Sequence, residues 1–288
     1  MKIARECIHC MARQAVEIAE EATTCEATQQ DIIRKSLNEL AKMNFNETSP
    51  EVAYRMHQHA KEATGIKDPY YDLKQDYNKI AQQIADRIRG EKWMENADKP
   101  FDLACRLAIA GNIIDFSAGL DLDFADVLKS VEGSLSQDIF GTGVEKLEKA
   151  VVGADRILYI VDNAGEIIFD RFLIEHLPMD KVTLAVKGGP IVNDATLEDA
   201  VAAGLTDMVT VIDNGHDAQG TVLHQCSRAF LDVYDQADLI ISKGQANFET
   251  LSDQRDKNIH FMLRAKCISV ANAIGCEKMD YVLTDLSQ

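Results

Sequence analysis

The hydrophobic pattern of this 288-residue chain changes at about residue 140. Before that point, apolar residues recur every three to four positions, which is the spacing of a buried helix face, and few segments favour a strand. After that point, short runs rich in β-branched residues alternate with segments of helical spacing. Strands that alternate with helices predict a parallel sheet with helices on both faces. The chain is therefore expected to be an α/β protein.

Short apolar runs in the second half predict five strands. These runs cover residues 156–161, 181–186, 208–212, 239–242 and 267–271. The expected architecture is a Rossmann-like, three-layer α/β fold with a parallel sheet and a helical N-terminal subdomain. We place the helical subdomain at residues 1–140 and the α/β domain at residues 141–288. The segment 101–116 is too apolar to be stable alone, so the two parts are expected to form one cooperative unit.

The charge balance restricts the partners of the chain. It has 30 Lys and Arg residues and 47 Asp and Glu residues, which gives a formal net charge of −17. Nucleic acids and anionic membranes need a basic surface, so neither partner is expected, whereas a metal cation is a natural one. There is no signal-peptide pattern and no apolar run of roughly 18 residues, so a cytoplasmic location is expected. The oligomeric state stays open.

Gly-rich polar segments follow the first four predicted strands, at the edge where α/β sheets bind ligands. Asp162, Asn163 and Asp194 offer oxygen ligands from two of these segments, as in an incomplete shell for Mg²⁺ or Mn²⁺. Taken singly, each residue also fits a turn or a helix cap. The recurrence of such residues at all four strand ends favours a functional site.

Lys243 directly follows a buried strand, where it is predicted to bind a phosphate as a point charge; an ordinary loop lysine is the alternative. Gly244 and Gly220 would allow backbone amides to approach an anion. The chain has no GxGxxG after the first strand, no P-loop and no GxSxG motif. These absences disfavour a dinucleotide site, a P-loop nucleotide site and a serine hydrolase.

Two further sets of residues allow more than one interpretation. Cys7 and Cys10 form a CxxC motif at a helix start, which is half of a Zn or Fe site with Cys267 as a candidate third ligand; packed free thiols are the alternative. Asn112 and Asp115 lie three residues apart in an apolar helical segment. They either bond to neighbouring helices or close over the end of the sheet.

The strand-end segments resemble those of the damage-control phosphatases, the family also known as DUF89. The similar segments are residues 162–166, 193–196 and 243–249, in the family's order, together with Cys7, Cys10 and residues 110–116, which resemble its stand-alone prokaryotic branch. The resemblance covers nearly the whole chain. It implies a helical N-terminal part, a Rossmann-like α/β part and a metal-dependent phosphatase activity.

The resemblance also implies specific roles. Asp162, Asn163 and Asp194 would hold the metal, and Lys243 would contact the substrate phosphate. The family uses Mn²⁺, Co²⁺, Ni²⁺ or Mg²⁺ and acts on small phosphorylated metabolites, including sugar phosphates and damaged phosphopantetheine-type compounds. Apart from the resemblance, the CxxC motif would allow a cysteine-bound Zn or Fe as a second metal.

The predicted reaction is hydrolysis of a small phosphomonoester by a metal-bound water. Asp162 or Asp194 would orient this water, and Glu166 would support the site or act as a general base. The candidates for contacting the leaving group are Asn112, Asp115, Asp217 and Asn247. The alternatives are a non-catalytic α/β protein that binds a metal or metabolite, and a redox, Zn or Fe–S protein centred on the cysteines.

Overall fold

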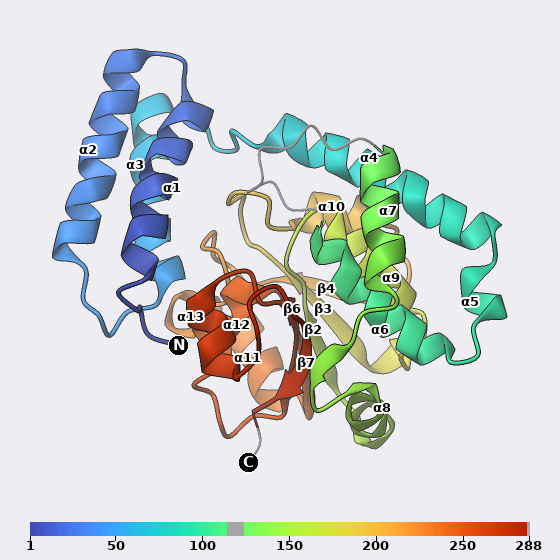
Figure 1. Cartoon of the computed structure of the whole chain (residues 1–288). Coiled ribbons are helices and arrows are strands. Elements are labelled where there is room, and N and C mark those ends of the chain that lie inside the picture. Colours follow the sequence, from blue (N-terminus) through green and yellow to red (C-terminus); the bar gives the residue numbers. More distant parts are fainter. Residues whose placement is uncertain (114–123, 287–288) are drawn as a thin grey trace.

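The computed structural model describes residues 1–113 and 124–286, which form a seven-stranded sheet with helices on both faces (Figure 1). The strands are β1 (Ile139–Gly141), β2 (Ile157–Ile160), β3 (Val182–Val186), β4 (Thr210–Asp213), β5 (Leu239–Lys243), β6 (Ile259–Arg264) and β7 (Tyr281–Asp285). Their order across the sheet is β1-β7-β6-β5-β2-β3-β4. The predicted α/β class is confirmed, and four of the five predicted strands correspond to β2, β3, β4 and β5.

The sheet differs from the prediction at one edge. β7 runs antiparallel to β6 and β1 runs parallel to β7, so the sheet is mostly rather than wholly parallel. The strand predicted at 267–271 is wrong, because this segment begins helix α13 (Ile268–Ile274). Cys267 is the residue before that helix, and its Sγ accepts a hydrogen bond from the backbone N–H of Val270 at 3.4 Å.

The helices of the N-terminal half differ in how they pack. They are α1 (Cys7–Ala22), α2 (Glu26–Lys42), α3 (Ser49–Thr64), α4 (Tyr71–Gly90), α5 (Trp93–Asn96), α6 (Pro100–Ala110), the 3-10 turn η1 (Gly111–Ile113) and α7 (Phe124–Ser134). Helices α1, α2 and α3 pack on one another and stand beside the sheet (Figure 1). Helices α4 and α6 pack on α9 (Glu166–Ile174), which follows β2.

The remaining helices connect the strands of the second half. They are α8 (Val144–Gly153), η3 (Met179–Lys181), α10 (Leu197–Ala202), η4 (Leu223–Gln225), α11 (Arg228–Gln236) and α12 (Gln245–Leu251). The described residues include no helix with the length and hydrophobicity that crossing a membrane requires.

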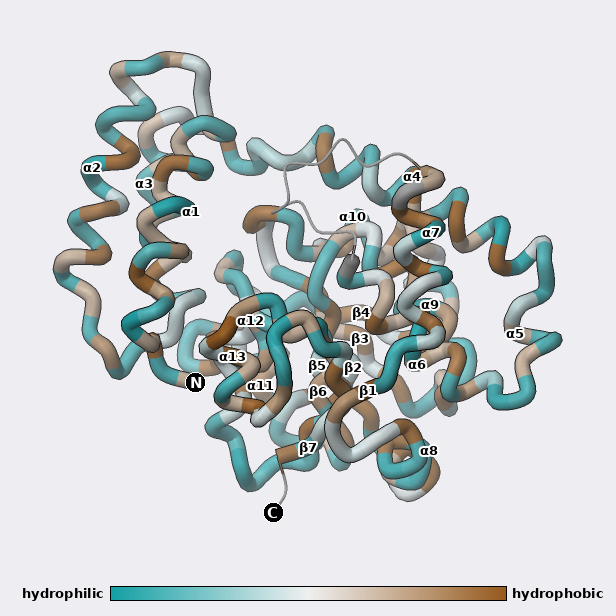
Figure 2. The backbone as a smooth tube through the Cα atoms, in the orientation of Figure 1, coloured by the Kyte–Doolittle hydropathy of each residue, from teal (hydrophilic) through white to brown (hydrophobic). Residues whose placement is uncertain are grey.

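Alternate residues of the strands enter different apolar clusters. Tyr159 and Ile241 pack with α4, α6 and α9, whereas Leu158 and Ile240 pack with α11, α12 and α13. The strands at the centre are therefore apolar on both faces, as expected for parallel strands between two helical layers (Figure 2). Helices α1, α2 and α3 have a separate cluster that includes Ile32. The clusters thus divide the helical half between α3 and α4, whereas the sequence placed its single boundary at residue 140.

Candidate active site

The segments that follow β2 and β3 are joined side by side. The backbone N–H of Ala195 donates to the carbonyl oxygen of Asp162, and that of Ala164 donates to the carbonyl oxygen of Asn193, both at 2.8 Å. Asn163 and Asp194 are also paired in an isolated antiparallel bridge. The structure therefore brings Asp162, Asn163 and Asp194 together at the carboxyl ends of neighbouring strands.

Asp162, Glu166 and Asp194 form a cluster of buried carboxylates at this place. The side-chain amide of Asn112 donates to Asp162 Oδ2 at 3.0 Å and to Glu166 Oε2 at 2.6 Å. The amide of Asn163 donates to the same two oxygens, at 2.7 and 3.0 Å. Of the two interpretations of Asn112, the structure thus supports the one in which its face covers the end of the sheet. Asp115 lies outside the described residues.

The buried carboxylates of the cluster repel one another. Burial and the charges of Glu166 and Asp194 raise the pKa of Asp162 well above its ordinary value. Burial also raises the pKa of Asp194 to about 6, although Lys187 Nζ lies 3.3 Å from its Oδ2 and opposes that rise. A bound divalent cation would favour the ionised carboxylates and reduce the repulsion between them.

The donor set suits a hard cation such as Mg²⁺ or Mn²⁺, because it consists of carboxylate and amide oxygens. Among the described residues, no three His, Cys, Asp or Glu side chains are already arranged as ligands, so the amide of Asn163 would be needed beside Asp162 and Asp194. In addition, Asn112 Oδ1 is buried and has no hydrogen-bond partner in the described part of the chain. The residues present fit a divalent metal.

Lys243 is fully buried beneath the carboxylate cluster. Its Nζ donates to Glu166 Oε1 at 2.7 Å, to Asp170 Oδ1 at 2.5 Å and to the carbonyl oxygen of Ala108 at 2.8 Å. Burial alone would lower its pKa, but the charges of Asp170 and Glu166 outweigh burial and raise it. The structure thus places Lys243 as the buried counter-ion of Glu166 and Asp170.

Gly244 lies directly against Asp162. A Cβ atom on Gly244 would come within 1.9 Å of Asp162 Oδ2, and the φ of this residue is +83°. Gly220, with φ +67°, is similarly close to the backbone, since its Cβ would lie 2.4 Å from the carbonyl oxygen of Ala246. Both glycines thus allow close approach to a protein oxygen, that of the Asp162 carboxylate at Gly244 and that of the Ala246 carbonyl at Gly220.

The comparisons with known proteins agree with this geometry. The profile of the damage-control phosphatase ARMT1-like domain matches residues 3–282. The chain belongs to this family. A damage-control phosphatase of Pyrococcus horikoshii is 38% identical over 286 residues, which cover 96% of each chain. A damage-control phosphatase of Archaeoglobus fulgidus is 32% identical over 291 residues, which cover 98% of each chain.

A solved structure gives the same result. The crystal structure of a DUF89 family protein from Pyrococcus horikoshii matches with a TM-score of 0.90 and 36% identity, and the match covers 98% of both chains. The family resemblance of the strand-end segments is therefore confirmed, and so is the fold class that it implied.

Two of the predicted leaving-group residues have other partners in this member of the family. Asn247 is buried and donates to the carbonyl oxygens of Val161 and Lys243, at 3.0 and 2.7 Å. It therefore fastens α12 to the ends of β2 and β5. Asp217 lies in the segment after β4, where Lys61 of α3 donates to its Oδ2 at 2.6 Å.

The structure does not bring Cys7, Cys10 and Cys267 together as a three-ligand group. Cys7 Sγ lies 3.9 Å from Ser269 Oγ, Cys267 Sγ accepts the bond from the Val270 N–H, and Cys10 is exposed. No three-ligand group of His, Cys, Asp or Glu occurs among the described residues, which include these cysteines. Cys7 and Cys267 thus make the contacts of packed thiols, whereas Cys10 does not.

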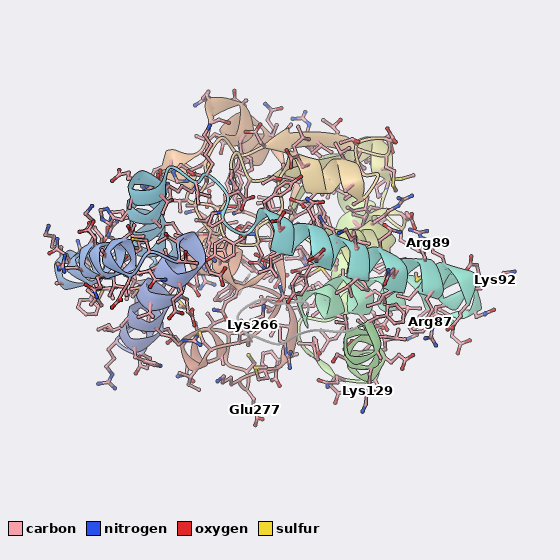
Figure 3. The ribbon with its side chains drawn as sticks, turned by 90° about the horizontal axis from the view of Figure 1, so that it is seen from above. Arg87, Arg89, Lys92, Lys129, Lys266 and Glu277 are labelled. Carbon is pink, nitrogen blue, oxygen red and sulfur yellow. The ribbon has the colours of Figure 1, made fainter. Side chains whose placement is uncertain are left out.

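Lys266 lies close enough to the candidate site to influence Asp162, and the sequence analysis did not identify it. It follows β6, and its charge opposes the rise in the pKa of Asp162. In the view from above it lies toward the middle of the molecule, whereas Arg89 and Lys92 lie toward one end (Figure 3). The signal was the apolar run at 259–263, which, if taken as a strand, places Lys266 at a strand end.

Proposed function

We propose that this chain is a divalent-metal-dependent phosphatase that hydrolyses small phosphomonoesters, such as sugar phosphates or damaged phosphorylated metabolites. The observation that carries the proposal is the buried cluster of Asp162, Glu166 and Asp194 at the carboxyl ends of β2 and β3. Such a cluster is costly without a cation, and perturbed carboxylates gather at functional sites. The family relatives named as damage-control phosphatases support the reaction class.

Each residue of the site has a proposed task. Asp162, Asn163 and Asp194 hold the metal, for which Mn²⁺, Co²⁺, Ni²⁺ and Mg²⁺ are the candidates, and which supplies charge neutralisation and an acidified water when bound. Asp162 and Asp194 orient the attacking water. Lys266, half-buried beside the cluster, binds a phosphate oxygen.

Glu166 has a supporting task in this proposal. Its Oε1 accepts from Lys243, and its Oε2 accepts from Asn112 and Asn163. Because both carboxylate oxygens are already engaged by donors and the side chain is fully buried, Glu166 fixes the amides and is not free to accept a proton from water. Between the two roles predicted from the sequence, the geometry favours support of the site.

The test is phosphate release from p-nitrophenyl phosphate and a panel of sugar and cofactor phosphates. The protein is stripped with chelator and then supplied separately with Mg²⁺, Mn²⁺, Co²⁺ and Ni²⁺. We expect metal-dependent release in the wild type and a loss of about 10³-fold or more in Asp162→Asn, which removes one ligand charge. The matched control is Asp207→Asn at an exposed position before β4.

Stability separates a lost site from a lost fold. Because Asp162 is repelled by its neighbours, Asp162→Asn is expected to melt at or above the wild-type temperature in metal-free buffer. Full activity of the folded Asp162→Asn variant, or release that does not depend on any metal, would refute the proposal.

A further inference from the structure

Asn78 of α4 joins two helix starts that lie far apart in the sequence. Its Oδ1 accepts a hydrogen bond from the backbone N–H of Gly165 at 2.6 Å, and its Nδ2 donates to Asp199 Oδ1 at 2.7 Å. The side chain is buried, so water does not compete for either bond. Asn78 belongs to the helical half, whereas both of its partners belong to the α/β half.

The two partners define where α9 and α10 begin. Gly165 is the residue before α9, and its φ is +74°. Asp199 closes the capping box of α10, since its Oδ2 accepts from the backbone N–H and the hydroxyl of Thr196, at 2.8 and 2.9 Å. A single side chain therefore connects the helix that follows β2 with the helix that follows β3.

These two helix starts adjoin the candidate metal ligands. Asn163 lies two residues before Gly165, and Asp194 lies two residues before Thr196. The backbone bonds of Ala164 and Ala195 already tie the two segments together at their strand ends. Asn78 adds a tie from a different element, α4, which packs against α9 (Figure 1).

A second residue shows that this face of α4 is directed toward the site. Lys74, one helical turn before Asn78, is buried and lies 2.8 Å from Asp68 Oδ2. Its positive charge opposes the rise in the pKa of Asp194, although less than that of Lys187 does. Residues four positions apart share a helix face, so Lys74 and Asn78 approach the two segments together.

The chemistry of the bridge requires an amide. The Gly165 N–H needs an acceptor, whereas the Asp199 carboxylate needs a donor, and an amide side chain provides one of each. An aspartate at position 78 would satisfy Gly165 but would place a second carboxylate against Asp199. An apolar residue would leave both groups buried without partners.

We propose that Asn78 is a positioning residue that sets the spacing between the Asp162–Asn163 segment and the Asp194 segment. It does so by bridging Gly165 and Asp199, neither of which is a candidate ligand. This inference rests on the proposed function for the identity of the ligands. It adds that the helical half completes the geometry of the site.

The experiment exchanges the amide and the carboxylate between positions 78 and 199. Asn78→Asp alone sets two carboxylates against each other. The double variant Asn78→Asp/Asp199→Asn restores the bridge, because the new carboxylate would accept from both the Gly165 N–H and the new amide, whose oxygen would still accept from Thr196. The matched control is Gln83→Ala at an exposed position of α4. Mn²⁺ affinity is measured by titration calorimetry, and amide exchange of Gly165 is measured in the metal-free protein.

We expect Asn78→Asp to weaken Mn²⁺ binding by about 10- to 100-fold, which is typical when a residue that orients ligands is lost. Its kcat should fall by a similar factor with a smaller change in KM, and exchange of the Gly165 amide should accelerate. The double variant should recover Mn²⁺ affinity to within about threefold of the wild type and restore the protection of Gly165.

Two results would overturn the inference. One is a folded Asn78→Asp variant with the Mn²⁺ affinity of Gln83→Ala, which would make the bridge merely structural. The other is a double variant in which Gly165 is protected again but Mn²⁺ affinity is not recovered. If Asn78→Asp does not fold, Asp199→Asn takes its place as the variant with the broken bridge. Its Mn²⁺ affinity and Gly165 exchange are then compared with those of the double variant and of Gln83→Ala. A wild type that binds no metal refutes the proposed function, and with it this inference, while Gly165 exchange still reports on the bridge.

Discussion

The two groups of helices that precede the sheet differ in what they contribute. Helices α1, α2 and α3 enclose their own apolar cluster and meet the α/β half through local contacts, such as the Lys61–Asp217 ion pair and the Tyr54–His216 ring contact. Helices α4 and α6 share one apolar cluster with the sheet and α9. The second group also leads to the site, through Asn78 of α4 and through Asn112, which follows α6.

This difference shows that sequence proximity is a poor guide to functional units here. A single helical subdomain was expected, but its second part is built into the proposed active site. The first part is attached beside that site and has a core of its own. We therefore expect changes near α4, α6 and the strand ends to affect activity, and changes inside α1, α2 and α3 to affect mainly that unit.

The largest contrast is expected between two glycines with positive φ. In Gly244→Ala the new Cβ would collide with Asp162, whereas Gly65, which follows α3 with φ +70°, has no atom within 4 Å of such a Cβ in the described part of the chain. We expect phosphatase activity to fall by about 100-fold or more in Gly244→Ala, since small displacements of a catalytic group have effects of this size. Gly65→Ala should bear only the backbone strain, about 1 kcal/mol, and keep its activity.

Steady-state kinetics and urea unfolding of the two variants check this contrast. Equal losses of activity in both would mean that backbone strain alone, without displacement of Asp162, explains the effect. They would also remove the distinction between the two regions.

A pair of core truncations should sharpen the comparison. Leu107 of α6 and Ile32 of α2 are both fully buried, but they belong to different clusters. Each change to Ala is expected to cost about 2–5 kcal/mol. Leu107→Ala should lower the protection of the sheet amides against hydrogen exchange. Ile32→Ala should lower protection in α1, α2 and α3 alone.

Hydrogen exchange monitored by mass spectrometry resolves these segments. If Ile32→Ala also exposes the sheet amides, the two regions unfold as one cooperative unit. That outcome would agree with the expectation from the sequence and contradict the division inferred from the clusters.

Hydrophobic periodicity predicted several of the helices and the four strands β2 to β5, because these segments are long or continuously apolar. It missed β1, which has only three residues, and also β6 and β7, whose sequences carry His260, Arg264 and Asp285 among the apolar residues. It placed a strand at 267–271 because Ile268 and Val270 are β-branched, although two alanines and the preceding cap favour the helix. Because the last strand was placed at 267–271 and not at β6, Lys266 was not predicted to lie at a strand end.

The sequence predicts those features of the candidate site that follow from the order of the strands. It does not predict those that depend on the direction of a side chain. Asp162 and Asp194 meet because they follow neighbouring strands, and the sequence indicates that order. Lys243 was expected to face a phosphate, but it is the last residue of β5 and points to the same face as Leu239 and Ile241. Period-2 alternation directs it toward α6 and α9, where Glu166 and Asp170 lie.

The smallest effect that we predict concerns the docking of α3. His57 is buried, and burial lowers its pKa to about 3, with a further lowering by Lys61 and an opposing effect of Asp217. The unfolded chain binds a proton below about pH 6.5, whereas the folded state does so only near pH 3, so stability falls as the pH drops below 6.5. Between pH 7 and pH 5 the loss is expected to be about 2 kcal/mol, and to appear in α1, α2 and α3 before the sheet.

The pH slope of His57→Gln tests this assignment. The variant is expected to be less stable than the wild type at pH 7, because packing is lost, but to lose less stability between pH 7 and pH 5. His59→Gln is the matched control, since His59 lies on the same helix with its Nε2 3.1 Å from Glu39 Oε1 and is partly exposed. Urea unfolding at both pH values gives the slopes. A slope of His57→Gln equal to that of the wild type would show that another group causes the acid sensitivity, and that the contact between α3 and the strand-end segments is not controlled by this buried ring.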